Sequence, residues 1–178
     1  TAATSSGCRY DMRIGREMRM RLYHGSDVEV VSPQLRESRR ALDFGEGFYV
    51  TSSCDQACKW AISVCGRRGT RSATVSVYEF DTSALDWLDV CRFDEADSDW
   101  LEFVTLNRKQ AYSGRTFDVV VGPVANDRTM TVLMLYFSGL LSQDETIERL
   151  KVQRLRDQYA FKSGRSLRQL FFLEAMML

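Results

Sequence analysis

The stretch Leu22-Tyr-His-Gly-Ser26 carries the one histidine of the chain, His24, at the end of an alternating segment. In residues 18–23, Met-Arg-Met-Arg-Leu-Tyr, the type of side chain alternates with a period of two. This pattern predicts a strand that ends at His24-Gly25. A histidine in this position is more often a structural residue than a ligand contact. The segments that follow it in the chain therefore decide how His24 is interpreted.

The segment Phe44-Gly-Glu-Gly-Phe-Tyr-Val50 is entered through two glycines and is rich in aromatic side chains, so it predicts a second strand over residues 44–50. Directly after it, Ser53-Cys-Asp-Gln56 has the Ser-x-x-Gln form of a helix capping box. Gly66 is the predicted end of this helix. The apolar residues that recur at helical spacing are Ala57, Trp60, Ala61 and Val64.

The rest of the chain mixes strands and helices without a regular alternation. Strands are predicted over residues 74–80, 117–121, 158–161 and 169–173. Helices are predicted near 81–86, from Asp97 to about 107, over 130–141 and over 142–155. Because no β-α-β repeat is visible, the order of elements indicates an α+β domain rather than a doubly wound parallel sheet.

Length and composition fit one globular domain. The 178 residues suit a flexible tail over residues 1–17 and a folded domain over 18–178, and the 44% of hydrophobic residues is enough to close a core. The 24 basic residues equal the 24 acidic ones, so no overall field attracts nucleic acid. Five arginines between positions 9 and 21 form a local basic patch, which is a solvated face, a frayed terminus, or an RNA or partner contact.

Several classes of protein are disfavoured by what the sequence lacks. No apolar run approaches the ~20 residues of a membrane span, so we expect a cytoplasmic protein without membrane contact. The five cysteines are odd in number and irregularly spaced, which predicts free thiols. One histidine cannot build a multi-histidine metal centre, and we expect no metal.

Taken together, the motifs resemble the ADP-ribosyltransferase superfamily, in the branch of diphtheria toxin and the poly(ADP-ribose) polymerases. Leu22-Tyr-His-Gly-Ser26 resembles the first strand of that branch, whose His-Gly-Ser binds NAD, and residues 44–50 resemble its second strand. The interval from Tyr49 to Trp60 matches its paired nicotinamide-stacking aromatics. Asp157-Gln-Tyr-Ala-Phe161 looks like the strand that presents its catalytic glutamate. The resemblance implies an ADP-ribosyltransferase-like fold, with split mixed and antiparallel sheets that form an NAD cleft flanked by helices.

The chain is also similar to a bacterial family of toxin-like proteins within that superfamily. The shared pattern appears as Trp100-Leu-Glu-Phe103 with Asn107-Arg108, as Asp118-Val-Val-Val-Gly-Pro123 with Ala125-Asn-Asp127, and as Gln158-Tyr-Ala-Phe161. This similarity implies a toxin of a toxin-antitoxin pair, with a small antitoxin protein as its partner. It also implies NAD as the co-substrate and a macromolecular acceptor that is a protein or a nucleic acid.

The resemblance also implies roles for single residues. His24 would hydrogen-bond the adenine-side ribose, the Gly25 backbone would pair with the nicotinamide amide, and Tyr49 would stack on the nicotinamide ring. Gln158 departs from the family pattern because it stands where the catalytic glutamate is expected, and a neutral amide supplies no negative charge. The catalytic set is Gln158, His24 and Tyr49, and the NAD-binding set is His24, Gly25, Ser26, Gly47, Phe48, Tyr49, Trp60, Arg108, Asn126 and Asp127.

Several of these residues have a second interpretation. The spacing of Trp60 is also that of an ordinary core face. Asn126-Asp127 can be a helix cap with a favourable first-turn charge, and Arg108 can bind the pyrophosphate of NAD or lie on the exposed side of its helix.

The resemblance as a whole leads us to expect a mono-ADP-ribosyltransferase. The alternatives are a catalytically weak or inactive module that binds NAD or ADP-ribose, and a plain interaction protein.

Overall fold

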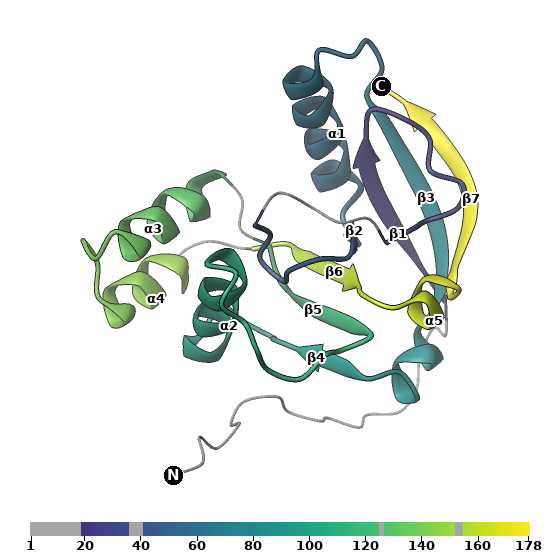
Figure 1. Cartoon of the computed structure of the whole chain (residues 1–178). Coiled ribbons are helices and arrows are strands. Elements are labelled where there is room, and N and C mark those ends of the chain that lie inside the picture. The colour runs from purple at the N-terminus through teal and green to yellow at the C-terminus, as the bar shows by residue number, and fades with distance from the viewer. Residues whose placement is uncertain (1–18, 36–40, 125–126, 152–154) are drawn as a thin grey trace.

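The computed structural model describes residues 19–35, 41–124, 127–151 and 155–178, and of residues 127 and 128 it describes the backbone alone. These residues form two β-sheets with helices around them (Figure 1). The predicted α+β class is therefore confirmed. The predicted tail over residues 1–17 lies outside the described part of the chain.

The first sheet is antiparallel and has the strand order β1-β3-β7. Its strands are β1 (Arg19–Ser26), β3 (Thr74–Asp81) and β7 (Leu170–Met177). In β1, Leu22, His24 and Ser26 share one face, while Tyr23 and Gly25 share the other. This alternation separates the residues that point to the second sheet from those that point to the neighbouring helix.

The second sheet is mixed and has the order β2-β6-β5-β4. Its strands are β2 (Phe48–Val50), β6 (Asp157–Phe161), β5 (Val119–Pro123) and β4 (Val90–Arg92), of which β4 and β5 run parallel. Two main-chain hydrogen bonds between Tyr23 and Thr51, of 2.8 and 3.0 Å, join the first sheet to the end of β2. The two sheets are thus tied together close to His24.

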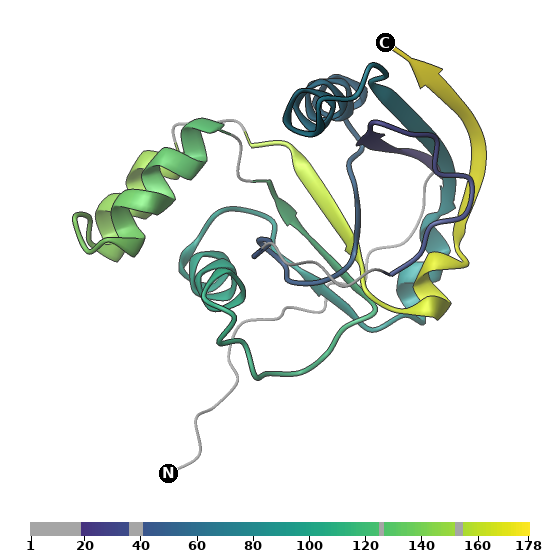
Figure 2. The same cartoon turned by 45° about the horizontal axis from the view of Figure 1, so that its top comes forward.

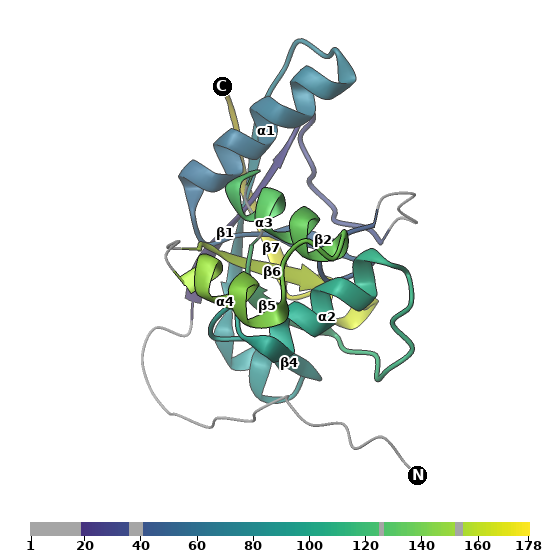
Figure 3. The ribbon, with the colours of Figure 1, turned by 90° about the vertical axis from the view of Figure 1, so that its left-hand side faces the viewer.

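Helices flank both sheets, and they are α1 (Cys54–Arg68), α2 (Ser98–Arg108), α3 (Asp127–Phe137), α4 (Gln143–Lys151), α5 (Gly164–Leu167) and the 3-10 helix η1 (Thr82–Asp86). Figures 1 and 2 show α1 lying along the first sheet, and α3 and α4 as a helical hairpin at the opposite side of the molecule. Seen from that side, α2 lies beside the second sheet (Figure 3).

The main core lies between the two sheets. The ring of Phe80 in β3 meets the ring of Phe161 in β6 edge-on, with centroids 5.4 Å apart. Leu22 and Tyr78 belong to the same buried cluster as Val121. Burial of such apolar area contributes roughly 25 cal/mol per Å² and is the main force that holds the sheets together.

Several predicted boundaries were wrong, each for a local reason. The second strand begins at Phe48 rather than at residue 44, because Gly45 has φ of 74°, which no strand residue adopts. Helix α1 continues past Gly66 and ends at Arg68, where Gly69, with φ of 66°, forms the left-handed cap. The helix predicted to reach residue 141 ends at Phe137, just before Gly139 with φ of 75°.

Other elements differ in length. The strand predicted over 117–121 begins at Val119 and includes Gly122-Pro123, and β7 extends to Met177 instead of ending at residue 173. Strand β4 was not predicted, because three residues are too few to show a period. The helix predicted over 142–155 is described as α4 as far as Lys151.

The predicted helix starts were accurate where a cap was readable. Ser53 caps α1 and accepts a hydrogen bond from the Gln56 amide, and Asp97 caps α2 by accepting one from the Trp100 amide at 2.9 Å. None of the helices described here is both long and apolar enough to cross a membrane.

Candidate functional site

A pocket of about 480 Å³ opens between β1, α1 and the end of the second sheet. Its wall is formed by His24, Gly25, Ser26, Leu42, Asp43, Tyr49, Trp60, Val64, Arg67, Arg68, Arg108, Val124 and Gln158. The pocket thus joins segments that are far apart in the sequence. It brings together Gln158 of the expected catalytic set and six of the residues expected to bind NAD: His24, Gly25, Ser26, Tyr49, Trp60 and Arg108.

The second sheet places Tyr49 and Gln158 on the same face. Tyr49 lies opposite Ala160 in the antiparallel pairing of β2 with β6, so these two side chains point to the same side. Gln158 comes two residues before Ala160 and therefore shares that side. The intervening Tyr159 points the other way, into the core between the sheets.

His24 reaches the pocket from β1 and is held on two sides. Its Nδ1 lies 2.7 Å from the main-chain carbonyl oxygen of Tyr49, and its ring stacks on Phe48 with centroids 4.3 Å apart. Burial lowers the pKa of His24, against the opposing effect of the Tyr49 carbonyl, and the nearby charge of Arg68 lowers it further. The imidazole is therefore neutral at pH 7, with Nδ1 as donor and Nε2 as acceptor.

The ring of Tyr49 lines the pocket, and its hydroxyl is hydrogen-bonded to main-chain atoms of the protein. The hydroxyl donates to the carbonyl oxygen of Gly45 at 2.5 Å and accepts from the amide of Phe44 at 3.2 Å. Burial raises the pKa of Tyr49 far above its ordinary value, and the neighbouring charge of Asp43 adds to the effect. This tyrosine can therefore stack against a flat ligand but cannot act as an acid or base near neutral pH.

Gln158 is 2% exposed and lines the pocket. Among the described residues, no buried side-chain nitrogen or oxygen lacks a hydrogen-bond partner. Because Gln158 lines the pocket, its carboxamide can offer a donor and an acceptor to a ligand. The carboxamide can therefore form hydrogen bonds with a hydroxyl or an amide group of a ligand in the pocket.

Asp157, the residue before Gln158, is committed elsewhere. Its carboxylate accepts hydrogen bonds from the hydroxyl of Ser52 at 2.6 Å, from the amide of Ser52 at 2.9 Å and from the hydroxyl of Thr51 at 3.2 Å. This carboxylate holds the connection between β2 and α1 and does not line the pocket. It therefore does not replace the glutamate that the resemblance leads us to expect at position 158.

Helix α1 forms the opposite wall with a stripe of side chains. Trp60, Val64 and Arg67 are spaced four and three residues apart, so they lie on one side of the helix. Ala57 and Ala61 lie on the buried side, where they pack against Val75 of β3. Trp60 therefore lies in the pocket wall, while Ala57 and Ala61 form the core face of the helix.

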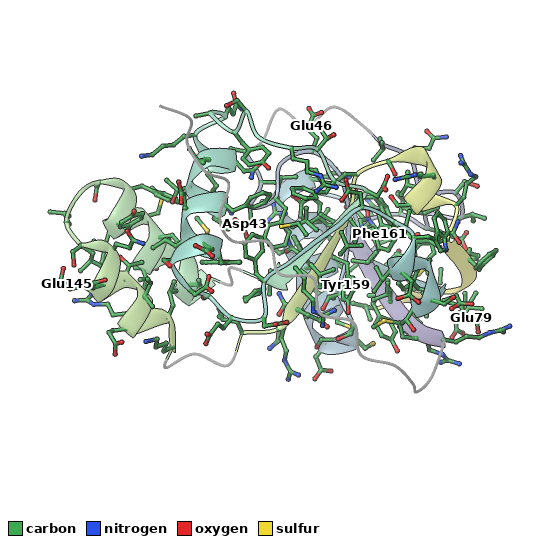
Figure 4. The ribbon with its side chains drawn as sticks, turned by 90° about the horizontal axis from the view of Figure 1, so that it is seen from below. Asp43, Glu46, Glu79, Glu145, Tyr159 and Phe161 are labelled. Carbon is green, nitrogen blue, oxygen red and sulfur yellow. The ribbon has the colours of Figure 1, made fainter. Side chains whose placement is uncertain are left out.

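Arg108 lies at the end of α2 and is bound to Asp43, with 2.6 Å between guanidinium and carboxylate. The side chains are 25% and 5% exposed, so this pair is largely removed from water. Arg108 is thus not on the exposed side of its helix. Figure 4 shows Asp43 near the middle of the molecule, far from Glu145 on α4.

Gly25 lines the pocket with its backbone, but its missing side chain faces α1. A Cβ at this position would lie 2.1 Å from the carbonyl oxygen of Ala57 and 2.7 Å from the amide of Ala61. Both are main-chain atoms of a helix, so moving them away from an added Cβ would cost a large amount of free energy. The glycine is therefore required for the packing of α1 against β1, a reason that the sequence does not reveal.

Two described residues expected in the site, Phe48 and Gly47, do not line the pocket. Phe48 stacks behind His24, and Gly47 lies where a Cβ would come 3.0 Å from the carbonyl oxygen of Phe161. Asn126 lies outside the described residues, and only the backbone of Asp127 is described, as the first residue of α3.

Sequence reasoning missed six residues of the wall: Leu42, Asp43, Val64, Arg67, Arg68 and Val124. Helical spacing from Trp60 was a signal for Val64 and Arg67. No pattern marks Asp43, because it lies in a loop that only the fold brings to α2. Within the described part of the chain, no cluster of three or more histidine, cysteine or acidic residues is placed to hold a metal ion.

Fold and site together define an α+β protein whose pocket offers a neutral imidazole, two aromatic rings, a buried carboxamide and three guanidinium groups. A model of the family described as "Protein of unknown function (DUF3990)" matches residues 20–172. The match covers most of the chain, and the protein belongs to this family. No curated protein matches the chain at a significant level.

Proposed function

We propose that this protein binds NAD in the pocket and transfers its ADP-ribose group to an acceptor, as a mono-ADP-ribosyltransferase with an ADP-ribosyltransferase-like fold. The observation that carries the proposal is that His24, Tyr49 and Gln158 line one pocket, although they come from three strands that are separate in the sequence, β1, β2 and β6. These are the positions at which the sequence resembles that superfamily.

The chemistry of the pocket suits this ligand. Nε2 of His24 is an acceptor for a ribose hydroxyl, the ring of Tyr49 offers a surface for nicotinamide, and Trp60 lies in the same wall. Stacking contributes on the order of 0.5–1.5 kcal/mol beyond burial of the rings. The carboxamide of Gln158 carries both a donor and an acceptor, so it can bond a ribose hydroxyl or the nicotinamide amide.

The reaction breaks the bond between the nicotinamide nitrogen and ribose C1′. Nicotinamide leaves as a neutral molecule with the bonding electron pair, and the ribose develops oxocarbenium character. The acceptor then forms the new bond to C1′ and loses a proton. The residues of this chain position the two parts of NAD, while neutral Gln158 adds no charge to stabilise the cation, which predicts slow transfer.

Release of nicotinamide from NAD tests the proposal. We expect turnover by the wild-type protein and a loss of at least tenfold in His24→Ala and in Tyr49→Ala. The Gly66→Ala variant is the matched control, because position 66 lies on α1 with no atom within 4 Å of an added Cβ. Equal rates in all four proteins would reject the site.

A second candidate is a module that binds NAD or ADP-ribose without turnover. The neutral Gln158 favours it, because among described residues the one carboxylate in the pocket wall, that of Asp43, is paired with Arg108. Tight NAD binding by calorimetry with no nicotinamide release would favour this module over an enzyme.

The toxin role rests on the resemblance. In that role the protein acts in the bacterial cytoplasm on a protein or nucleic acid, and a small antitoxin neutralises it. Mass spectrometry of a lysate incubated with the protein and labelled NAD would identify the acceptor. Growth arrest on expression, relieved by His24→Ala, would support the toxin role.

A further inference from the structure

Three guanidinium groups line the pocket, but two of them are already neutralised. Arg108 lies 2.6 Å from the carboxylate of Asp43, and Arg68 lies 2.6 Å from that of Asp27. Both carboxylates are buried, with exposed fractions of 5% and 6%. Breaking either pair would leave a buried negative charge without its partner, which is strongly unfavourable. These two arginines therefore hold the wall of the pocket in place.

Arg67 is the third, and its charge is not neutralised. Its Nη1 donates to the hydroxyl of Ser63 at 2.7 Å, and a hydroxyl carries no charge. In the part of the chain that the structure describes, no carboxylate lies within salt-bridge distance of Arg67. The guanidinium keeps four further N–H donors and a full positive charge at the pocket wall.

The position of Arg67 on α1 places this charge beside the aromatic wall. Trp60 and Arg67 are two helical turns apart on the same side of the helix, with Val64 between them. A rise of 1.5 Å per residue separates their Cα atoms by about 10 Å along the axis. The aromatic ring and the positive charge are thus offered at two separate places along the same wall.

We propose that Arg67 binds the diphosphate of the ligand and selects a nucleotide diphosphate over the corresponding nucleoside. The inference rests on the proposed NAD site and specifies which part of the ligand helix α1 contacts. A guanidinium can donate two parallel hydrogen bonds to phosphate oxygens, and an arginine without a carboxylate partner gives up no ion pair when it does so.

Calorimetry with two ligands tests this assignment. NAD carries the diphosphate, and nicotinamide riboside lacks it. Arg67→Gln is expected to weaken NAD binding about tenfold and to leave nicotinamide riboside binding unchanged. Arg71→Gln is the control, because Arg71 is exposed just beyond α1 and does not line the pocket. It should change neither affinity.

The salt dependence of the NAD affinity gives a second measurement. Raising the salt concentration should weaken NAD binding to the wild-type protein more than to Arg67→Gln, because the variant lacks the screened charge. If wild-type protein binds NAD and Arg67→Gln binds it equally well, the role of Arg67 is wrong and the NAD site stands. A loss of both ligands in Arg67→Gln, or an equal loss of NAD binding in Arg71→Gln, also overturns it. If wild-type protein binds no NAD, the proposed function falls together with this inference.

Discussion

The imidazole of His24 donates from Nδ1 to the main-chain carbonyl of Tyr49 across 2.7 Å, so a side chain of the first sheet is joined directly to a strand of the second. This bond fixes the tautomer of the ring, because a carbonyl oxygen can only accept. It also fixes the direction in which Nε2 points. His24 and Tyr49, the two residues at which the sequence resembles the NAD-binding residues of the superfamily, are therefore held in a fixed position relative to each other.

The first prediction concerns pH. Burial lowers the pKa of folded His24, whereas the unfolded imidazole binds a proton near its ordinary pKa of 6.5. Below that pH the unfolded state binds more protons than the folded state, so stability falls as the pH drops. The free energy of unfolding of the wild-type protein should fall by about 1 kcal/mol more than that of His24→Gln between pH 7.5 and 5.5. Urea unfolding at the two pH values measures the difference, and identical losses would show that His24 is not buried as described.

The second prediction concerns Gly25. An added Cβ would meet main-chain atoms of Ala57 and Ala61 at 2.1 and 2.7 Å, so Gly25→Ala should destabilise the protein by about 3 kcal/mol. Gly66→Ala should stabilise it by about 0.5–1 kcal/mol, because alanine is the better helix former and no atom is in the way. Thermal unfolding of both variants tests this opposite pair of effects. A mild effect of Gly25→Ala would mean that α1 packs less closely on β1 than described.

The third prediction separates the ring of Tyr49 from its hydroxyl. Tyr49→Phe removes the hydrogen bonds to Gly45 and Phe44, which should cost about 1–2 kcal/mol of stability while NAD turnover stays within a few-fold of wild type. Tyr49→Ala removes the ring as well, and turnover should fall at least tenfold. Steady-state assays beside denaturant melts resolve the two effects. A complete loss of turnover in Tyr49→Phe would instead assign the hydroxyl a direct role.

The fourth prediction concerns the charge that is missing at position 158. Gln158→Glu should increase the rate of nicotinamide release by about 10²-fold, because a carboxylate stabilises the developing cation. Burial raises the pKa of a carboxyl in such a place, so the gain should grow as the pH rises. Gln158→Leu, with similar volume and no polar atoms, should show no gain. NAD binding retained by Gln158→Glu without faster release would favour the non-catalytic module.

Local patterns were reliable where the physical cause was local. Ser53 and Asp97 each accept a hydrogen bond from an amide of the turn they cap, so both helix starts were readable from a few neighbouring residues. Strand β3 was predicted to within one residue, since its β-branched and aromatic residues (Thr74, Val75, Val77, Tyr78 and Phe80) favour a strand locally. The start of β2 was misplaced because Gly45 has a left-handed backbone and lies against Asn107 and Lys162, two residues that only the fold brings there.

By itself the sequence determined the α+β class and the set of His24, Tyr49, Trp60 and Gln158, because periodicity and capping act over a few residues and a resemblance needs only residue order. Only the tertiary structure decided that these side chains share one pocket, that Asp43 neutralises Arg108 and that Arg67 keeps its charge. The physical reason is that strand register and helix packing determine which faces meet, and these depend on contacts between segments far apart in the chain.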